Sequence, residues 1–373
     1  MTQKLPVFNF KIGSLEKKYI KDCLDTSFIG QGSYVKEFEK QFSKFVNCKF
    51  GITTTSGTTA LHLALKTLDI GDGDEVLVSS STNMACAFSI IYCNAKPVPI
   101  DIHKNTWQMN TDLIEKKITK KTKAIMVVHL FGQSVDMDPI INLAKKYNLK
   151  IIEDCAESHG VEYKGRKVGS IGDIGAFSFY VNKTITCGEG GMITTNSDKL
   201  AEKARNLKNL CYGKVNKFMH DDIGFNYRLP NVSAAMGLGQ LSQISEIFEQ
   251  KKRIDERYKK NLTGVKGLNI PEINKHTNKF IMWVFNLYLD NRFGVSRDEL
   301  ATKLKELNIE TREAFVPVNM QQVLQKKYNL NEKDCPNSNY IMDHGFYIPS
   351  GNTITDNEID YVSEKIIEIG NKK

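Results

Sequence analysis

The sequence predicts an α/β fold in which a large domain with a mostly parallel sheet is followed by a smaller α+β domain. Between residues 50 and 200, short β-branched runs alternate with segments of helical period, which is typical of βαβ units around a sheet covered on both faces. No internal repeat or low-complexity tract is visible, so a solenoid is excluded. The length of 373 residues suggests two domains, which we expect at 1–245 and 246–373.

The expected elements of the large domain come first along the chain. Residues 71–74 (GDGD) form a tight turn that leads into a buried strand. Strands are expected at 75–79, 97–101, 124–130, 150–154, 174–180 and 191–195, with helices at 58–68, 111–118, 138–147 and 198–210.

The expected elements of the second domain follow a long connecting helix. Asn231 is predicted to be the N-cap of this helix, which would run from 232 to about 262. A strand at 282–289 and helices at 296–307 and 356–369 give the C-terminal part its α+β character.

The composition excludes several classes of protein. With 51 Lys+Arg, 43 Asp+Glu and 41% hydrophobic residues, the chain is typical of a folded protein with a net charge of +8. The longest apolar runs, such as 124–130, are far shorter than the roughly 20 residues that cross a bilayer. No basic stripe with interleaved aromatics is present, so we expect neither a membrane nor a nucleic-acid partner.

The cysteines and the N-terminal segment predict a cytoplasmic protein. Eight Cys occur without a C-x-x-C pair, which is typical of reduced thiols rather than of disulfides or zinc. Residues 1–10 lack the apolar core of a secretory signal peptide.

A first candidate cluster lies at residues 55–60 (TSGTTA), just before an expected helix. Glycine allows a close backbone approach, and hydroxyls at a helix N-terminus can bind a phosphate. Ordinary N-capping explains the same residues equally well. No Gly-Lys-Ser/Thr follows, so this is not a nucleotide-triphosphate P-loop.

A second cluster, residues 153–157 (EDCAE), places acids directly after an apolar strand. That position is the carboxyl edge of a parallel sheet, where ligands bind, and a carboxylate there requires a cationic partner. A metal is the alternative, but the neighbourhood shows no His/Asp/Glu trio at ligand spacing. His159 alone is better explained as a hydrogen-bonded core residue, and we expect no metal.

A third cluster, residues 178–184 (SFYVNKT), places Lys183 at the end of an apolar strand. Burial lowers the pKa of a lysine and makes its amine a nucleophile for carbonyls. The following Gly-rich stretch, 188–191 (GEGG), allows a tight return of the chain but is also a common turn. The fourth cluster, 222–228 (DIGFNYR), is by itself only a polar loop.

Together these clusters predict a site for pyridoxal 5′-phosphate (PLP). The hydroxyl cluster would bind the phosphate, and the carboxylate would keep the pyridine nitrogen protonated so that the ring accepts electrons. Lys183 would form a Schiff base with the cofactor aldehyde.

With these residues in place, the sequence resembles the DegT/StrS family of nucleotide-sugar aminotransferases nearly from end to end. The resemblance implies the PLP-dependent transferase fold of the aspartate aminotransferase type (type I). It rests on residues 30–39 (GQGSYVKEFE), 56–62 (SGTTALH), 153–157, 188–191, 226–228 (NYR), 234–237 (AAMG) and 240–241 (QL).

The resemblance also implies roles for single residues. Lys183 matches the lysine that binds the cofactor and moves protons, and Asp154 matches the partner of the pyridine nitrogen. Glu157 stands where the family usually has Gln, near the cofactor hydroxyl. The matches for phosphate ligands are Gly57, Thr58 and Ser178.

Asn226 matches the residue that reaches the phosphate of the neighbouring subunit. The resemblance therefore implies a homodimer with shared active sites. The implied substrates are L-glutamate, which leaves as 2-oxoglutarate, and a nucleotide-linked keto sugar, which becomes an amino sugar for polysaccharide or glycan synthesis.

Residues 182–186 (NKTIT) and 220–221 (HD) are similar to the subgroup that aminates carbon 4 of GDP-4-keto-6-deoxymannose and gives GDP-perosamine. UDP- or dTDP-linked keto sugars aminated at C4 or C3 remain alternatives. A PLP-dependent sugar dehydratase would carry His in place of Lys183 and is disfavoured.

The chain departs from the family where an aromatic residue usually covers the cofactor ring. Residues 81–85 read STNMA, so the ring would pack on Met84 or on the Asn83 amide. Cys187 replaces a more usual Thr or Ser before Gly188. Glu313 and Asn319 are also unusual near the expected sugar site, and we assign them no role.

Overall fold

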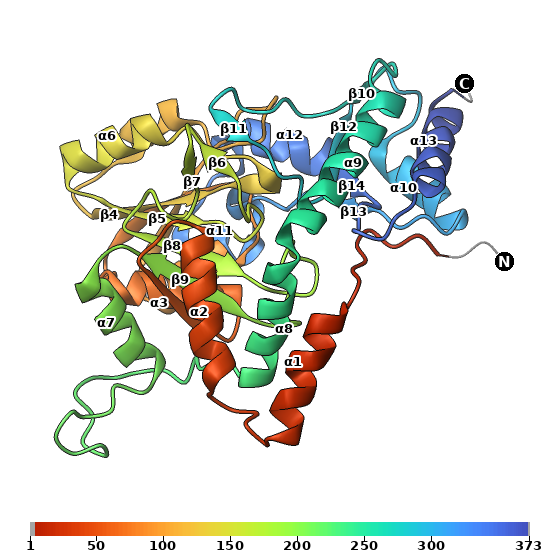
Figure 1. The fold of residues 1–373 in the computed structure, drawn as a ribbon. Helices are drawn as coiled ribbons and strands as arrows, with labels where there is room; N and C mark the ends of the chain where they lie inside the picture. The colour runs from red at the N-terminus through yellow and green to blue at the C-terminus, as the bar shows by residue number, and fades with distance from the viewer. Residues whose placement is uncertain (1–3, 372–373) are drawn as a thin grey trace.

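A seven-stranded sheet forms the centre of the structure, a computed structural model that describes residues 4–371 (Figure 1). The first three residues of the segment 1–10 therefore lie outside the described residues. The strand order is β1-β9-β8-β5-β4-β2-β3. The strands are β1 (Phe50–Thr54), β2 (Glu75–Ser79), β3 (Lys96–Ile100), β4 (Thr122–Val128), β5 (Lys150–Asp154), β8 (Ile174–Ser178) and β9 (Gly191–Thr195).

The sheet is mostly parallel, which confirms the expected fold class. Strands β3, β2, β4, β5 and β8 run parallel, with Val128 opposite Asp154 and Asp154 opposite Ala176. Strand β9 is antiparallel to both of its neighbours, β8 and β1. The six expected strands of this region lie within two residues of the observed ones.

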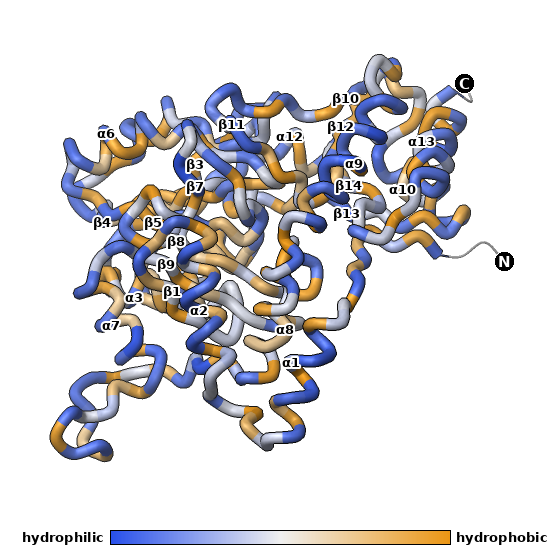
Figure 2. The backbone as a smooth tube through the Cα atoms, in the orientation of Figure 1, coloured by the Kyte–Doolittle hydropathy of each residue, from blue (hydrophilic) through white to orange (hydrophobic). Residues whose placement is uncertain are grey.

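Helices cover both faces of this sheet. On one face, α3 (Gly57–Thr67), α4 (Ala85–Tyr92) and α7 (Asp198–Lys208) contribute to a single apolar cluster with the strands. Helices α2 (Ser33–Phe45), α6 (Met137–Tyr147) and α8 (Asn231–Ser242) contribute to two clusters on the other face. Figure 2 shows polar and apolar residues alternating along α6, as expected for a helix with one buried side.

A smaller, four-stranded antiparallel sheet forms the C-terminal part, in the order β10-β12-β14-β13. Its strands are β10 (Leu268–Asn269), β12 (Phe285–Leu289), β13 (Arg312–Glu313) and β14 (Gly345–Ile348). Helices α9 (Ile244–Leu262), α10 (Arg297–Glu306) and α13 (Asp356–Gly370) pack with it around a separate apolar cluster. This part has the expected α+β character, and the domain boundary after residue 245 stays a prediction.

The expected single helix from 232 to about 262 is wrong, because two helices occupy that range. Helix α8 ends at Ser242 and α9 begins at Ile244, and Gln243 between them has φ −105° and ψ 13°. Pro230 is the N-cap of α8. The Asn231 side chain instead accepts hydrogen bonds from the amide nitrogens of Tyr34 (3.0 Å) and Val35 (3.3 Å), and so caps α2.

Shorter elements complete the described chain. The helices are α1 (Ser14–Asp25), α5 (Ile114–Lys117), α11 (Gln322–Tyr328) and α12 (Pro336–His344), with 3₁₀ turns at Thr111–Leu113, Leu130–Gly132, Val318–Met320 and Glu332–Asp334. A three-stranded sheet contains β6 (Glu162–Tyr163), β7 (Arg166–Lys167) and β11 (Thr277–Lys279). Over residues 4–371, none of the helices combines the length and apolar character that crossing a membrane requires.

Candidate active site

The N-terminus of α3 meets the carboxyl ends of β5 and β8. Ser56 is the N-cap: its Oγ accepts from the Thr59 amide (3.2 Å), and Thr59 Oγ1 accepts from the Ser56 amide (2.9 Å). The amides of Gly57 and Thr58 have no acceptor among residues 4–371. Such free N–H groups at a helix N-terminus attract an anion. Capping and phosphate binding, the two explanations of this cluster, are therefore compatible.

Gly57 allows α3 to approach the end of β8. A Cβ atom at Gly57 would lie 2.6 Å from Ser178 Cβ and 2.9 Å from Ser178 Oγ, closer than side-chain atoms can pack. The missing side chain thus places the Ser178 hydroxyl beside the free amides of Gly57 and Thr58.

Asp154, the last residue of β5, is buried and held by two donors. Its Oδ1 accepts from the Ala156 amide (2.9 Å), and its Oδ2 accepts from the Cys86 thiol (2.9 Å). Burial, followed by the charge of Asp154, raises the pKa of Cys86 well above its ordinary value, so the thiol keeps its proton. No described cation lies within ion-pair distance of Asp154. A buried carboxylate without a cation is costly, so the site favours a ligand with a positive charge here.

Lys183 lies on the connection between β8 and β9 and faces a second acid. Its Nζ is 3.4 Å from Glu157 Oε1, and Glu157 Oε2 accepts from the Phe131 amide (3.2 Å). Burial raises the pKa of Glu157 to about 7, although the charge of Lys183 acts in the opposite direction. Near neutral pH, Glu157 can therefore both hold and release a proton beside the lysine.

Two aromatic side chains from the C-terminal part, Trp283 and Tyr347, close the site on the other side. The Trp283 ring centroid lies 4.0 Å from Lys183 Nζ, and its Nε1 donates to the Asn182 carbonyl (2.7 Å). Phe131, whose φ of 53° lies in the left-handed region, stacks against Trp283 with ring centroids 5.7 Å apart. Burial raises the pKa of Tyr347, which also lines the site, to about 12, so this phenol stays neutral.

Six of the seven predicted site residues line one cavity of about 340 Å³, a size suited to a small ligand. They are Gly57, Thr58, Asp154, Glu157, Ser178 and Lys183. The seventh, Asn226, is exposed and lies outside this cavity, where its backbone pairs with Asn209. It follows a loop that projects away from the sheet below α7 in Figure 1.

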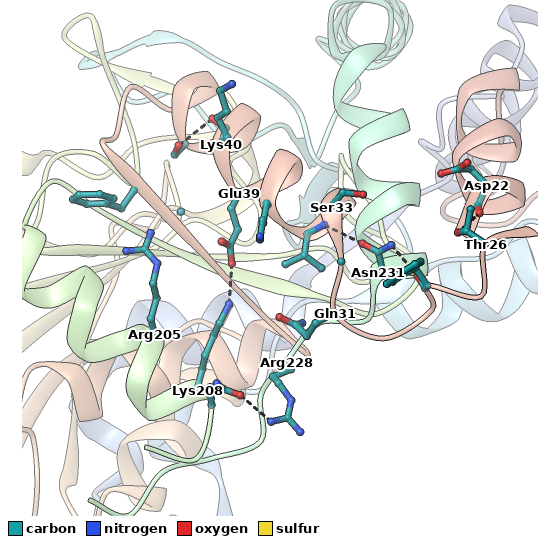
Figure 3. A pocket seen from close by; sticks show the side chains of 18 of the residues that line it. Asp22, Thr26, Gln31, Ser33, Glu39, Lys40, Arg205, Lys208, Arg228 and Asn231 are labelled. Carbon is teal, nitrogen blue, oxygen red and sulfur yellow. Dashed lines mark hydrogen bonds and ion pairs between the residues drawn. The ribbon is translucent and has the colours of Figure 1, made fainter. Parts of the chain in front are cut away.

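A larger cavity of about 1090 Å³ lies between α2 and α7, and it contains none of the predicted site residues (Figure 3). Lys208 crosses it with Nζ 2.8 Å from Glu39 Oε1 and 3.1 Å from the Thr53 carbonyl, so its charge is neutralised. Arg228 Nη1 donates to Asn209 Oδ1 (2.8 Å). Because the charge of Lys208 is already paired with Glu39 and none of the predicted site residues lines it, this cavity is a weaker candidate for catalysis than the smaller one.

One cluster of metal-ligating residue types was not expected from the sequence. His129, Glu153 and Cys155 bring ligand atoms within 4.8 Å of one another. The Glu153 oxygens, however, accept from His129 Nε2 (3.1 Å) and from the backbone amides of Gly169 (2.9 Å), Ile171 (2.7 Å) and Gly172 (2.7 Å). These bonds satisfy the carboxylate and fix the loop that precedes β8. Glu153 is therefore explained as a structural acid.

The sequence reasoning missed Trp283 and Cys86. Trp283 belongs to the apolar run expected to form a strand at 282–289, and nothing in that run distinguishes a cavity wall from a core residue. Of the two residues considered for ring packing, Asn83 lines the cavity, whereas Met84 packs beside Val318 and Leu324.

Comparisons with known proteins agree with this geometry. Residues 11–367 match the model of the DegT/DnrJ/EryC1/StrS aminotransferase family. The chain is 38% identical to the GDP-perosamine synthase of Escherichia coli O157:H7, over 99% of each chain. It is 37% identical to the GDP-perosamine synthase of Vibrio cholerae, over 95% of this chain and 96% of the relative. The crystal structure of DesV from S. venezuelae superimposes with a TM-score of 0.91 at 29% identity, covering 100% of both chains.

Proposed function

The chain belongs to the DegT/DnrJ/EryC1/StrS aminotransferase family, and we propose that it moves the amino group of L-glutamate to carbon 4 of GDP-4-keto-6-deoxymannose. The enzyme is a PLP-dependent sugar aminotransferase. The product of the proposed reaction is GDP-perosamine, a precursor for polysaccharide. The observation that carries the choice of substrate is the similarity to GDP-perosamine synthases over nearly the whole length of each chain.

The cavity residues fit the parts of PLP. The free amides of Gly57 and Thr58, with the Ser178 hydroxyl, suit the phosphate, and the uncompensated carboxylate of Asp154 suits a protonated pyridine nitrogen. When bound, PLP supplies an electron sink for the bond that breaks at the amino-acid α-carbon.

Two side chains of this chain would handle protons in that cavity. We assign to Lys183 Nζ both the covalent attachment of the cofactor and the transfer of the substrate proton. Glu157, with its pKa of about 7, lies beside Nζ and can take up or return a proton there. The wall formed by Trp283 and Tyr347 limits the access of water to Nζ.

A panel of nucleotide-linked keto sugars tests the choice of substrate. The purified enzyme with PLP and L-glutamate would receive GDP-4-keto-6-deoxymannose and UDP- and dTDP-linked keto sugars in parallel. We expect the highest kcat/KM with the GDP sugar, one 2-oxoglutarate per amino sugar, and an amine at carbon 4 by NMR. A higher kcat/KM with a UDP or dTDP sugar, or amination at carbon 3, would contradict the proposal. Loss of a hydroxyl without consumption of glutamate would indicate a dehydratase.

We further propose a homodimer in which Asn226 completes the partner's cavity. Asn226 lies outside its own cavity, and its loop exposes four large apolar side chains, Val215, Phe218, Met219 and Ile223. Exposed apolar groups of this kind mark an interaction surface. We place the enzyme in the cytoplasm, because all eight Cys are buried and free.

Mixing two inactive variants tests the shared site. Lys183→Ala and Asn226→Ala subunits would each be inactive or weak alone. After exchange, a mixed dimer would have one cavity with both native residues, so about a quarter of all cavities should be active. Light scattering should give the mass of two chains. A mixture that regains no activity, or a monomer by light scattering, would contradict the shared site.

A further inference from the structure

A buried lysine joins the helix α9 to the wall of the cofactor cavity. Lys251 lies near the middle of α9 and is only 5% exposed. Its Nζ donates to two backbone carbonyl oxygens, those of Trp283 (2.8 Å) and Ser350 (2.8 Å). Within residues 4–371, no carboxylate lies at ion-pair distance from this amine. The two carbonyls are therefore its binding partners.

Both carbonyls lie at the same end of the smaller sheet. Trp283 comes just before β12 and Ser350 just after β14, and the end residues Phe285 and Ile348 are paired in register. The Phe285 amide also donates to Ser350 Oγ (3.0 Å). Lys251 thus fixes the point at which two chain segments leave the sheet.

The side chain of Trp283 extends from this point to the reactive lysine. Its indole nitrogen donates to the Asn182 carbonyl, and its ring lies 4.0 Å from Lys183 Nζ. The backbone of Trp283 is therefore held by Lys251, while its ring contacts Lys183 and the neighbouring residue Asn182.

The bridge made by Lys251 does not depend on its charge. Burial lowers the pKa of this amine to about 7, so neutral and protonated forms coexist near neutral pH. A neutral amine still carries two N–H groups, and each carbonyl needs one. Both hydrogen bonds persist in either form, whereas an apolar residue of the same length would leave both buried carbonyls without a donor.

We propose that Lys251 is a positioning residue, which sets the Trp283 ring against Lys183 by binding the Trp283 carbonyl. Through that ring it fixes where the amine of Lys183 lies in the cavity. This inference rests on the proposed function only in taking Lys183 as the reactive amine.

Fluorescence of the cofactor-free protein tests the first half of the proposal. The chain has two Trp, and among residues 4–371 Trp107 Nε1 has no hydrogen-bond partner, so Trp107→Phe leaves Trp283 as the single tryptophan without breaking a described hydrogen bond. In that background, Lys251→Met should shift the emission to longer wavelength, because water reaches a displaced ring. Lys252→Met, the exposed next residue of the same helix, is the matched control and should leave the emission unchanged. An unshifted emission in Lys251→Met would overturn the proposal.

A double-mutant cycle in the PLP-loaded enzyme tests the second half. Lys251→Met should slow the half-reaction with L-glutamate by about 10- to 100-fold, the usual effect of misplacing a reacting group. In a Trp283→Phe background, the same substitution should add less than about twofold, because the ring through which Lys251 acts is already altered. Equal losses in both backgrounds would mean that Lys251 acts elsewhere, and would refute the positioning role.

A second variant covers the case in which Lys251→Met does not fold, and the emission comparison separates a failure of this inference from a failure of the proposed function. If Lys251→Met does not fold, Lys251→Gln keeps an NH2 donor group, but on a side chain one bond shorter than that of lysine. It should therefore give a smaller emission shift of the same sign; no shift would refute the proposal. If the native enzyme does not react with L-glutamate, the proposed function fails, while the emission comparison still decides the role of Lys251.

Discussion

Replacing Glu157 by Gln should remove a pH-dependent loss of stability. Glu157 is buried beside Lys183, and Gln has nearly the same shape and can still accept from the Phe131 amide. The two side chains differ mainly in that the amide carries no titrating proton. A comparison of the two proteins therefore isolates the proton equilibrium of this carboxyl.

The magnitude follows from the two pKa values of the carboxyl, 4.5 ordinarily and about 7 in the folded protein. Because the folded pKa is the higher one, the folded state binds the proton more tightly. The resulting stabilisation is fully present below pH 4.5 and is lost as the pH rises through about 7. At 1.36 kcal/mol per pKa unit, the free energy of unfolding should fall by about 2.5 kcal/mol between about pH 5 and about pH 8.

Urea unfolding of the cofactor-free protein at fixed concentration measures this effect. The advantage of Glu157→Gln over the native chain should grow by about 2.5 kcal/mol from pH 5 to pH 8. Glu249→Gln, an exposed acid in α9, is the control and should show no such change. A difference between Glu157→Gln and the native chain that stays constant with pH would refute the reasoning.

Three further substitutions test the cavity. Lys183→Ala should abolish amino transfer and leave no cofactor attached after borohydride reduction, as read by mass spectrometry. Full turnover by this variant would contradict the assignment of Lys183 as the reactive amine. Asp154→Asn should slow the reaction with L-glutamate by about 10²-fold in stopped-flow absorbance, since the electron sink loses its counter-charge, and an unchanged rate would contradict its role. Gly57→Ala places a methyl group 2.6 Å from Ser178 Cβ, so the affinity for PLP should fall about tenfold or more in an absorbance titration. Equal affinity would show that the helix end can move freely.

The position of the cavity in the large sheet could be predicted because the signals are local. Asp154 follows an apolar run, and Lys183 follows another, so each marks the carboxyl end of a strand without knowledge of the rest of the fold. The expected and observed bounds of β2, β5 and β9 agree for the same reason, since each run is buried on both faces.

The remaining features depend on contacts between distant residues. Asn231 has the residue type of an N-cap, but its side chain caps α2, nearly 200 positions earlier in the chain. The break at Gln243 coincides with a hydrogen bond from its side chain to Glu16 Oε2 (2.9 Å). The contact between the Trp283 ring and Lys183 Nζ likewise joins residues that are 100 positions apart in the sequence. A periodicity along the chain contains no information about such partners.

No short segment of the chain forms the cavity by itself, so the cavity is completed only late in the synthesis of the protein. Its wall combines residues from Ser56 to Tyr347, so a growing chain that has released the large sheet from the ribosome still lacks Trp283 and Tyr347. At about 5–20 residues per second, the interval between translation of Lys183 and of Tyr347 is about 10–30 s. During this interval the lysine amine is exposed to water. Capture of the cofactor in its final geometry therefore has to wait until translation is nearly complete.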